Sequence, residues 1–286
     1  MANVLLSSAL LFSRWIDAPV PYVIAARCVV ASAALFLFLK ISRSSFSGFA
    51  KEGQLTLDLW MLVASGILLA AHWITFFYSG RLSTIALAVV AMHTYPLMTS
   101  LIEPWLEESV EWKEYSLDIV LALLATAGIA YMGLSVAALE REGLFWGLAA
   151  AALITARNLV VRRKLSHWPS SQIMLGQISV AGLLLSPALI FYTVQQNFRP
   201  GLNDLILIVI LGVLITAIAH TMLTRAVVKM SARTTGVIAS VQPLYSALAA
   251  FLFFDEIPSV ATFLGGGVVL MAAMVESYRY HQRSSA

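Results

Sequence analysis

Residues 205–219 of this chain read LILIVILGVLITAIA, a run without a single charged side chain. Extended to 203–224, the run reaches the roughly 20 apolar residues that an α-helix needs to cross a bilayer. A buried strand is much shorter than this, and no polar face interrupts the run as it would in a half-exposed helix. The stretch therefore predicts a transmembrane helix.

The composition extends this interpretation to the whole chain. Of the 286 residues, 60% are hydrophobic and 12% are charged, and the mean hydropathy is +0.85. Soluble domains carry about 25% charged residues, so we exclude the soluble class. The apolar runs predict an all-α polytopic membrane protein with ten transmembrane helices, at 2–16, 20–40, 57–78, 83–105, 116–137, 143–161, 171–194, 203–224, 234–254 and 258–278. The first of these runs is short for a span.

Several classes of chemistry are missing from the sequence. One cysteine, Cys28, excludes an internal disulfide framework and a multi-cysteine metal site. The net charge of +3 is not gathered into a basic patch with interleaved aromatics, so we expect no nucleic-acid partner. Phosphate-binding loops, nucleophile motifs and the His-Glu-x-x-His pattern are also missing. We therefore expect neither an enzyme nor a cofactor or metal.

The distribution of Lys and Arg predicts the orientation. With the N-terminus inside, cytoplasmic segments hold 12 of these residues and outer segments hold 4. Positive residues concentrate on the cytoplasmic side of membrane proteins, so we expect both termini in the cytoplasm. The opening residues lack a basic segment and a cleavage site, so we expect the first run to be a retained helix.

Sequence landmarks recur at offsets of 143–148 residues. The pairs are Arg14 and Arg157, Pro21 and Pro169, Gly66 and Gly212, Pro96 and Pro243, and Glu107–Glu108 and Asp255–Glu256. They predict two repeats, 1–138 and 139–286, with five helices each. Because five is odd, the second repeat enters the membrane from the opposite face, as in many secondary transporters. A gene duplication without a transport function would leave the same trace.

The motifs around these landmarks resemble a known family. The first copy reads Thr94-Tyr-Pro-Leu-Met-Thr-Ser-Leu, and the second reads Ser240-Val-Gln-Pro-Leu-Tyr-Ser-Ala, followed by Asp255-Glu256 and Gly265-Gly-Gly. The pattern is similar to the EamA-type repeat of the drug/metabolite transporter superfamily, nearest to ten-helix exporters such as the YddG-like aromatic amino acid exporters. The resemblance implies a central cavity lined by the third, fourth, eighth and ninth helices, with the fifth and tenth paired away from it.

Polar side chains within spans are costly and mark a pathway or a structural contact. His72 lies inside the third span, and His220 and Gln177 lie in the eighth and seventh; we interpret all three as substrate-binding candidates. His93 is a weaker candidate, because a continuous helix would separate it from Tyr95 by about 200°. We therefore prefer Tyr95 in the cavity.

Two arginines and two prolines also lie within spans. Arg27 is too deep to reach water easily, so it is either a partner for a substrate carboxylate or a structural brace. Arg157 is close to Arg162, and we expect it to snorkel to the cytoplasm. Pro96 and Pro243 each break a backbone hydrogen bond at matching positions of the two halves. Paired breaks of this kind point to a binding site or hinge.

The remaining candidates are aromatic or lie beside the second proline. They could stack on a substrate or contact a cation, although a packed core would look the same. The set is Trp73, Phe77, Tyr78, Tyr95, Gln242 and Tyr245.

These observations together predict a function. We expect a bacterial inner-membrane exporter of amino acids or related zwitterions that works by alternating access as a monomer or weak homodimer in the lipid bilayer. Since no carboxylate lies in the middle of a span, facilitated transport is favoured over tight proton coupling. The alternative is a multidrug exporter of cationic or aromatic compounds. A structural or sensory membrane protein is a more distant alternative, and the repeat argues against it.

Overall fold

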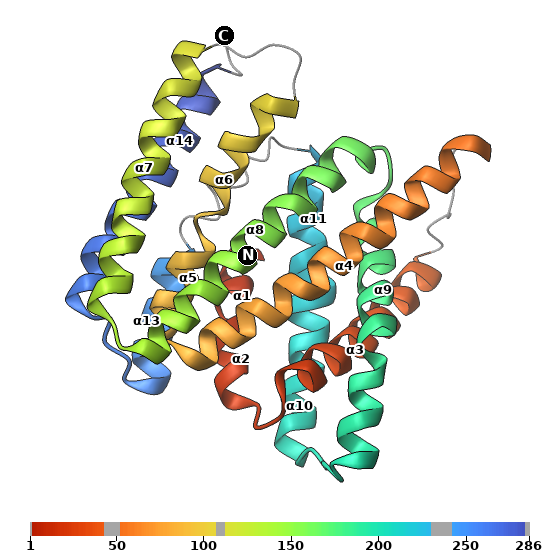
Figure 1. Cartoon of the computed structure of the whole chain (residues 1–286). Coiled ribbons are helices and arrows are strands. Elements are labelled where there is room, and N and C mark those ends of the chain that lie inside the picture. Colours follow the sequence, from red (N-terminus) through yellow and green to blue (C-terminus); the bar gives the residue numbers. More distant parts are fainter. Residues whose placement is uncertain (1, 43–51, 107–111, 230–241, 284–286) are drawn as a thin grey trace. The chain divides into compact units, whose positions relative to one another are not determined.

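A computed structural model describes residues 2–42, 52–106, 112–229 and 242–283 (Figure 1). Within these ranges the chain is helical and contains no strand, as predicted. Among the described residues, seven helical segments are long and apolar enough to cross a membrane: Val20–Ile41, Leu57–Leu82, Ile85–Ile102, Ser116–Ser135, Ala138–Lys164, Ser170–Gln195 and Leu202–Lys229. Seven of the ten predicted spans therefore correspond to helices of sufficient length.

The other three predicted spans are not among these seven helices. The first is divided into two short helices, α1 (Ala2–Ser7) and α2 (Ala9–Trp15). The ninth corresponds to the shorter apolar helix Gln242–Phe254, and the tenth corresponds to a 24-residue helix, Val260–Arg283, whose apolar part is Val260–Val275. The start of the predicted span 234–254 lies outside the described residues, as do Ser240 and the acidic pair Glu107–Glu108.

The chain forms two compact units. Unit 1 comprises Met1–Ile74 and Ala156–Lys229, and unit 2 comprises Thr75–Thr155 and Met230–Ala286. Unit 1 takes one segment from each predicted half, and these segments end 155 positions apart, at residues 74 and 229. The first segment of unit 2 crosses the predicted boundary at residue 138. The division by contacts thus differs from the division into repeats at 138, which describes sequence similarity and stays a prediction.

The helices of each unit are as follows. Unit 1 contains α1, α2, α3 (Val20–Ile41), most of α4 (Glu52–Leu82), the end of α8 (Ala138–Lys164), α9 (Ser170–Ile190), the π-helical η2 (Phe191–Gln195), α10 (Leu202–Ile210), the π-helical η3 (Leu211–Ala219) and α11 (His220–Lys229). Unit 2 contains the end of α4, α5 (Ile85–Met92), α6 (Tyr95–Ile102), η1 (Glu103–Leu106), α7 (Trp112–Ser135), the start of α8, α13 (Gln242–Phe254) and α14 (Val260–Arg283).

Prolines set the start of two corresponding helices in unit 1. Pro19 precedes α3 with φ −56° and ψ 138°, and Pro169 precedes α9 with φ −59° and ψ 131°. Proline suits the start of a helix because the first N–H groups have no partner there. The matching proline of the first half is therefore Pro19, 150 positions before Pro169, whereas Pro21, the expected partner, lies within the first turn of α3.

Two glycines allow helices of unit 1 to approach closely. A Cβ added at Gly66 on α4 would lie 2.8 Å from the Cβ of Val180 and 3.1 Å from the carbonyl oxygen of Gln177. A Cβ added at Gly212 on η3 would lie 2.8 Å from Val30 Cγ1 and 3.1 Å from the carbonyl oxygen of Arg27. Small residues are how membrane helices pack without a hydrophobic driving force. The two contacts are reciprocal between the predicted repeats.

The fifth and tenth predicted spans pair in unit 2, as the family resemblance implies. A Cβ at Gly128 of α7 would lie 2.7 Å from the carbonyl oxygen of Gly265 on α14, which shows how closely the two backbones approach. The acidic landmark of the second half also has a place in this unit. The Glu256 carboxylate accepts a hydrogen bond from the backbone N–H of Ile85 at 2.9 Å, at the start of α5, where a negative charge suits the helix dipole.

Candidate functional site

A buried guanidinium, indole and imidazole meet inside unit 1. The guanidinium carbon of Arg27 on α3 lies 4.1 Å from the ring centroid of Trp73 on α4. The Trp73 Nε1–H group donates a hydrogen bond to Nε2 of His220 on α11 at 3.3 Å. Because indole nitrogen only donates, this nitrogen of His220 carries no proton. Trp73 and Arg27 are each 1% exposed, so this cluster lies within the unit and not on its surface.

Local backbone features position the members of this cluster. Gly212 lets η3 pack against the backbone of Arg27, and η3 leads directly into His220, the first residue of α11. In the wider turn of a π-helix, the carbonyl oxygen five residues earlier in the chain is available as a hydrogen-bond acceptor. The hydroxyl group of Thr216 donates a hydrogen bond to such an oxygen, that of Leu211, at 2.9 Å. π-helical segments of this kind often occur at functional sites.

A second buried polar network centres on Arg157 of α8. Its Nε and Nη2 donate to Oε1 of Gln177 at 3.2 and 2.5 Å, and Nη2 also donates to Oγ1 of Thr224 at 2.8 Å. Nη1 donates to Oδ1 of Asn158 at 3.0 Å, and Nε2 of Gln177 donates to Oγ of Ser65 at 2.7 Å. Arg157 is 2% exposed. The prediction that it snorkels to the cytoplasm is therefore wrong, because neutral partners on α8, α9 and α11 hold it inside the unit.

The two groups are adjacent along α11. His220 and Thr224 are four residues apart, so they share one face of the helix at a separation of about 6 Å along its axis. His220 interacts electrostatically with Arg27, Arg157 and His72, and His72 is itself 4% exposed. The structure thus brings together five predicted residues of unit 1, namely Arg27, His72, Trp73, Gln177 and His220.

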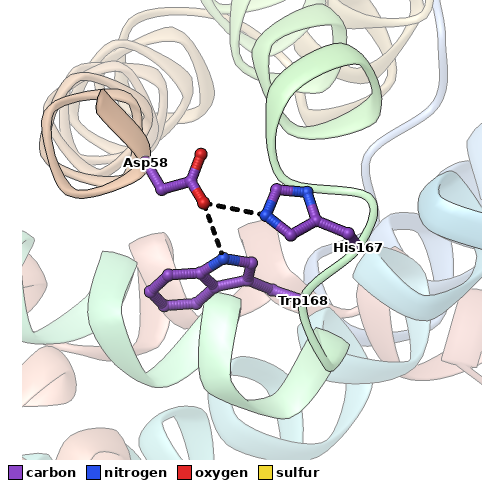
Figure 2. A network of polar contacts seen from close by, with 3 residues as sticks. All are labelled: Asp58, His167 and Trp168. Atoms are coloured by element: carbon purple, nitrogen blue, oxygen red, sulfur yellow. Dashed lines mark hydrogen bonds and ion pairs between the residues drawn. The ribbon is translucent and has the colours of Figure 1, made fainter. Parts of the chain in front are cut away.

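One buried carboxylate of unit 1 forms a separate network (Figure 2). Oδ2 of Asp58, near the start of α4, lies 2.8 Å from Nε2 of His167 and accepts a hydrogen bond from Nε1 of Trp168 at 3.1 Å. Asp58 is 3% exposed, whereas the His167 side chain is 41% exposed. Asp58 lies seven residues, about 10 Å along the helix, from Ser65. The Asp58 carboxylate therefore contacts the connection between α8 and α9 and does not belong to either of the two networks above.

The remaining predicted residues lie in unit 2. Tyr95 and Phe77 are buried, whereas Tyr245 is 44% exposed. The ring of Tyr78 lies 5.7 Å from that of Trp146. Gln242 and Pro243 begin α13, and both are buried.

The fourth predicted span is interrupted before Pro96. α5 ends at Met92 and α6 begins at Tyr95, so the geometry of a continuous helix does not apply between them. The argument that separated His93 from Tyr95 is therefore wrong: their ring centroids are 6.1 Å apart. The backbone oxygen of Tyr95 accepts a hydrogen bond from Thr155 Oγ1 at 3.1 Å.

Sequence reasoning missed several members of the buried networks. Ser65, Asn158 and Thr224 look like ordinary small polar residues of membrane helices, and only their partners distinguish them. Asp58 carried a signal, since a carboxylate at the edge of an apolar run requires a partner. No group of three metal-ligating side chains occurs among the residues that the structure describes.

Part of this chain matches a known protein family. Residues 141–278 match the EamA-like transporter family. The EamA-like segment covers just under half of the chain and includes Arg157, Gln177 and His220. It indicates a membrane transporter of small molecules, and together with the apolar helices it identifies a multi-pass membrane protein.

Solved structures are also similar to this chain. One, described as a crystal structure of a protein, is similar over 97% of this chain and 94% of its own, with a TM-score of 0.68 and 20% identity. At this identity the similarity concerns the fold alone. Among curated proteins, none matches the sequence.

Proposed function

We propose that the whole chain is an EamA-like secondary transporter that exports amino acids or related small zwitterions across the bacterial inner membrane. Both termini would lie in the cytoplasm, and the two inverted five-helix repeats, 1–138 and 139–286, would alternate access to the substrate. The EamA-like segment supports the transport function. The reciprocal contacts of Gly66 and Gly212 support the repeats, because each glycine packs against the other half at corresponding positions.

The proposed class of substrate follows from the positive sign of the buried charge. Among the described residues, the buried charged side chains of unit 1 are Arg27, Arg157 and Asp58. Asp58 is engaged at one end of α4 by His167 and Trp168. The polar interior is therefore cationic, and a buried positive charge favours a substrate that brings a negative group. A carboxylate-bearing zwitterion fulfils this condition.

The same observation disfavours the alternative, a multidrug exporter of cations. A cationic drug would meet the guanidinium of Arg157, whose hydrogen-bond partners are neutral, and like charges within a low-dielectric interior repel strongly. The face of Trp73, the obvious cation–π surface of the cluster, is already covered by the guanidinium of Arg27. Facilitated transport remains the preferred mechanism, because the buried carboxylate of unit 1 is near the end of its helix.

Counterflow in proteoliposomes tests this proposal. Vesicles containing the full-length protein are preloaded with one unlabelled amino acid, and uptake of labelled aromatic, aliphatic and charged amino acids is measured without an ion gradient. We expect transient accumulation of at least one labelled amino acid. Accumulation of a drug-like cation, with no amino acid transported under the same conditions, would replace the proposal with the multidrug alternative.

His72 provides a variant for the same assay. We expect His72→Ala to lower counterflow while the melting temperature remains close to that of the parent protein, because the buried His72 interacts electrostatically with His220 of the candidate site. A loss of folded protein equal to the loss of transport would instead give His72 a structural role.

A further inference from the structure

Arg157 contacts Gln177 through the Nε–Nη2 edge of its guanidinium, an edge through which arginine also binds carboxylates. Nε and Nη2 both donate to the single oxygen Oε1 of Gln177, at 3.2 and 2.5 Å. Carboxylates bind arginine through paired N–H groups on one edge of the guanidinium, and such pairs are stronger than bonds to a neutral amide. The amide oxygen of Gln177 therefore occupies the position that a carboxylate would take.

The other contacts of Arg157 satisfy its hydrogen bonds without neutralising its charge. Asn158 accepts from Nη1 and Thr224 accepts from Nη2, and both acceptors are neutral. No described carboxylate contacts this guanidinium, although it is 2% exposed. A buried ion without a counter-charge is costly in a protein and more so within a membrane. A ligand that supplies the missing negative charge would be favoured at this position.

Gln177 has a second partner that would hold it when its oxygen is displaced. Its Nε2 donates to Oγ of Ser65 at 2.7 Å, and Ser65 in turn donates to the carbonyl oxygen of Leu62 at 2.9 Å. The amide is thus held from the side of α4 independently of Arg157.

We infer that the Nε–Nη2 edge of Arg157 is the subsite for the substrate carboxylate, and that Gln177 closes this edge when no substrate is bound. The inference rests on the proposed function, since it assigns one end of a zwitterionic substrate to a specific residue. Recognition is by the carboxylate itself, so a substrate whose carboxylate is replaced by a carboxamide would bind weakly.

Thermal stabilisation of the purified full-length protein tests the subsite. The probes are the 20 common amino acids (about 1–10 mM, the range of weak binding) and the carboxamide of each acid that stabilises the parent protein. The variant Gln177→Glu places a permanent carboxylate on the Nε–Nη2 edge. The matched control Gln172→Glu makes the same change in the first turn of α9, five residues away, where a negative charge suits the helix N-terminus.

The subsite predicts opposite changes in stability and binding. Gln177→Glu should melt at a higher temperature than the parent without ligand, because the charge of Arg157 is neutralised. It should also lose affinity for the acid by at least about tenfold, because its own carboxylate competes with that of the ligand. The parent and Gln172→Glu should retain binding of the acid and discriminate against the carboxamide.

A purely structural Arg157 predicts a different result. Gln177→Glu would then be stabilised by the acid as much as the parent, and this outcome would overturn the subsite while leaving the proposed function intact. Failure of every amino acid to stabilise the parent would overturn both. If Gln177→Glu does not fold, the variant Arg157→Gln is tested instead. If this variant still binds the amino acid about tenfold more tightly than its carboxamide, the subsite is refuted. If it has lost that preference, the subsite is supported.

Discussion

Replacement of Gly66 by alanine perturbs the closest helix contact around the candidate site. The new methyl group would lie 2.8 Å from Val180 Cβ, 3.0 Å from Val180 Cγ1 and 3.1 Å from the carbonyl oxygen of Gln177. Carbon atoms in contact prefer separations of about 3.5–4.0 Å, so α4 and α9 must separate locally by roughly 0.5–1 Å. Neither neighbour can yield alone, because valine is stiff at χ1 and the oxygen belongs to a helix backbone.

The magnitude follows from two opposing effects. Overpacking a tight contact costs about 1–3 kcal/mol, whereas alanine is favoured over glycine in a helix by about 1 kcal/mol. Gly267→Ala on α14 measures the helix preference of alanine without overpacking, because a Cβ at Gly267 would have no atom within 4 Å. The difference between the two variants should therefore be about 1–3 kcal/mol. With about 2–4 °C per kcal/mol, Gly66→Ala should melt roughly 2–12 °C below Gly267→Ala.

Differential scanning fluorimetry of both detergent-purified variants measures this difference, and counterflow measures its effect on transport. Gly66→Ala should also transport more slowly, because the contact positions the backbone of Gln177. Gly212→Ala, which makes the reciprocal contact with Arg27, should show a loss of similar size. Equal melting temperatures for Gly66→Ala and Gly267→Ala would refute the close approach of α4 and α9 and the reasoning built on it.

Further predictions concern the other networks. Trp73→Phe keeps an aromatic face for the cation but removes the donor to His220, so unfolding should become easier by about 1 kcal/mol and transport should fall; unchanged thermal stability and transport would contradict the contact. Asp58→Ala should cost about 1–3 kcal/mol because it removes the acceptor of a hydrogen bond from the buried Trp168 indole, whereas His167→Ala should cost less than about 1 kcal/mol because its side chain is 41% exposed; a reversed order in thermal melts would contradict this assignment. Cys28 is fully buried, so a water-soluble maleimide should label it only after denaturation, and rapid labelling of the folded protein would place α3 at an accessible surface.

The comparison of sequence and structure separates local from long-range information. Hydrophobicity and length are local properties, so the apolar runs were sufficient to predict an all-helical membrane protein. All seven long helices of the described residues coincide with predicted spans for the same reason. Pro96 predicted the interruption between Met92 and Tyr95. The direction of the His93 side chain could not be predicted, because the angles of a continuous helix do not apply across the interruption.

The sequence also determined which glycines recur in both halves, but not what they contact. Gly66 and Gly212 were landmarks of an internal repeat, and the tertiary structure shows that each brings a helix against the backbone of Gln177 or Arg27. Sequence alone identifies that a small residue is present. The reason for its small size lies on another helix, more than 100 positions away.

Arg157 shows the same limit most clearly. Its nearness to Arg162 along the chain predicted a side chain directed toward water, but Gln177 and Thr224, 20 and 67 residues away in sequence, hold it inside the unit. Composition and the length of the apolar runs therefore determined that the chain lies in a membrane as helices. Only tertiary packing decided which polar groups became partners, because a guanidinium takes its partners from whichever neutral or charged groups the folded helices bring within about 3 Å.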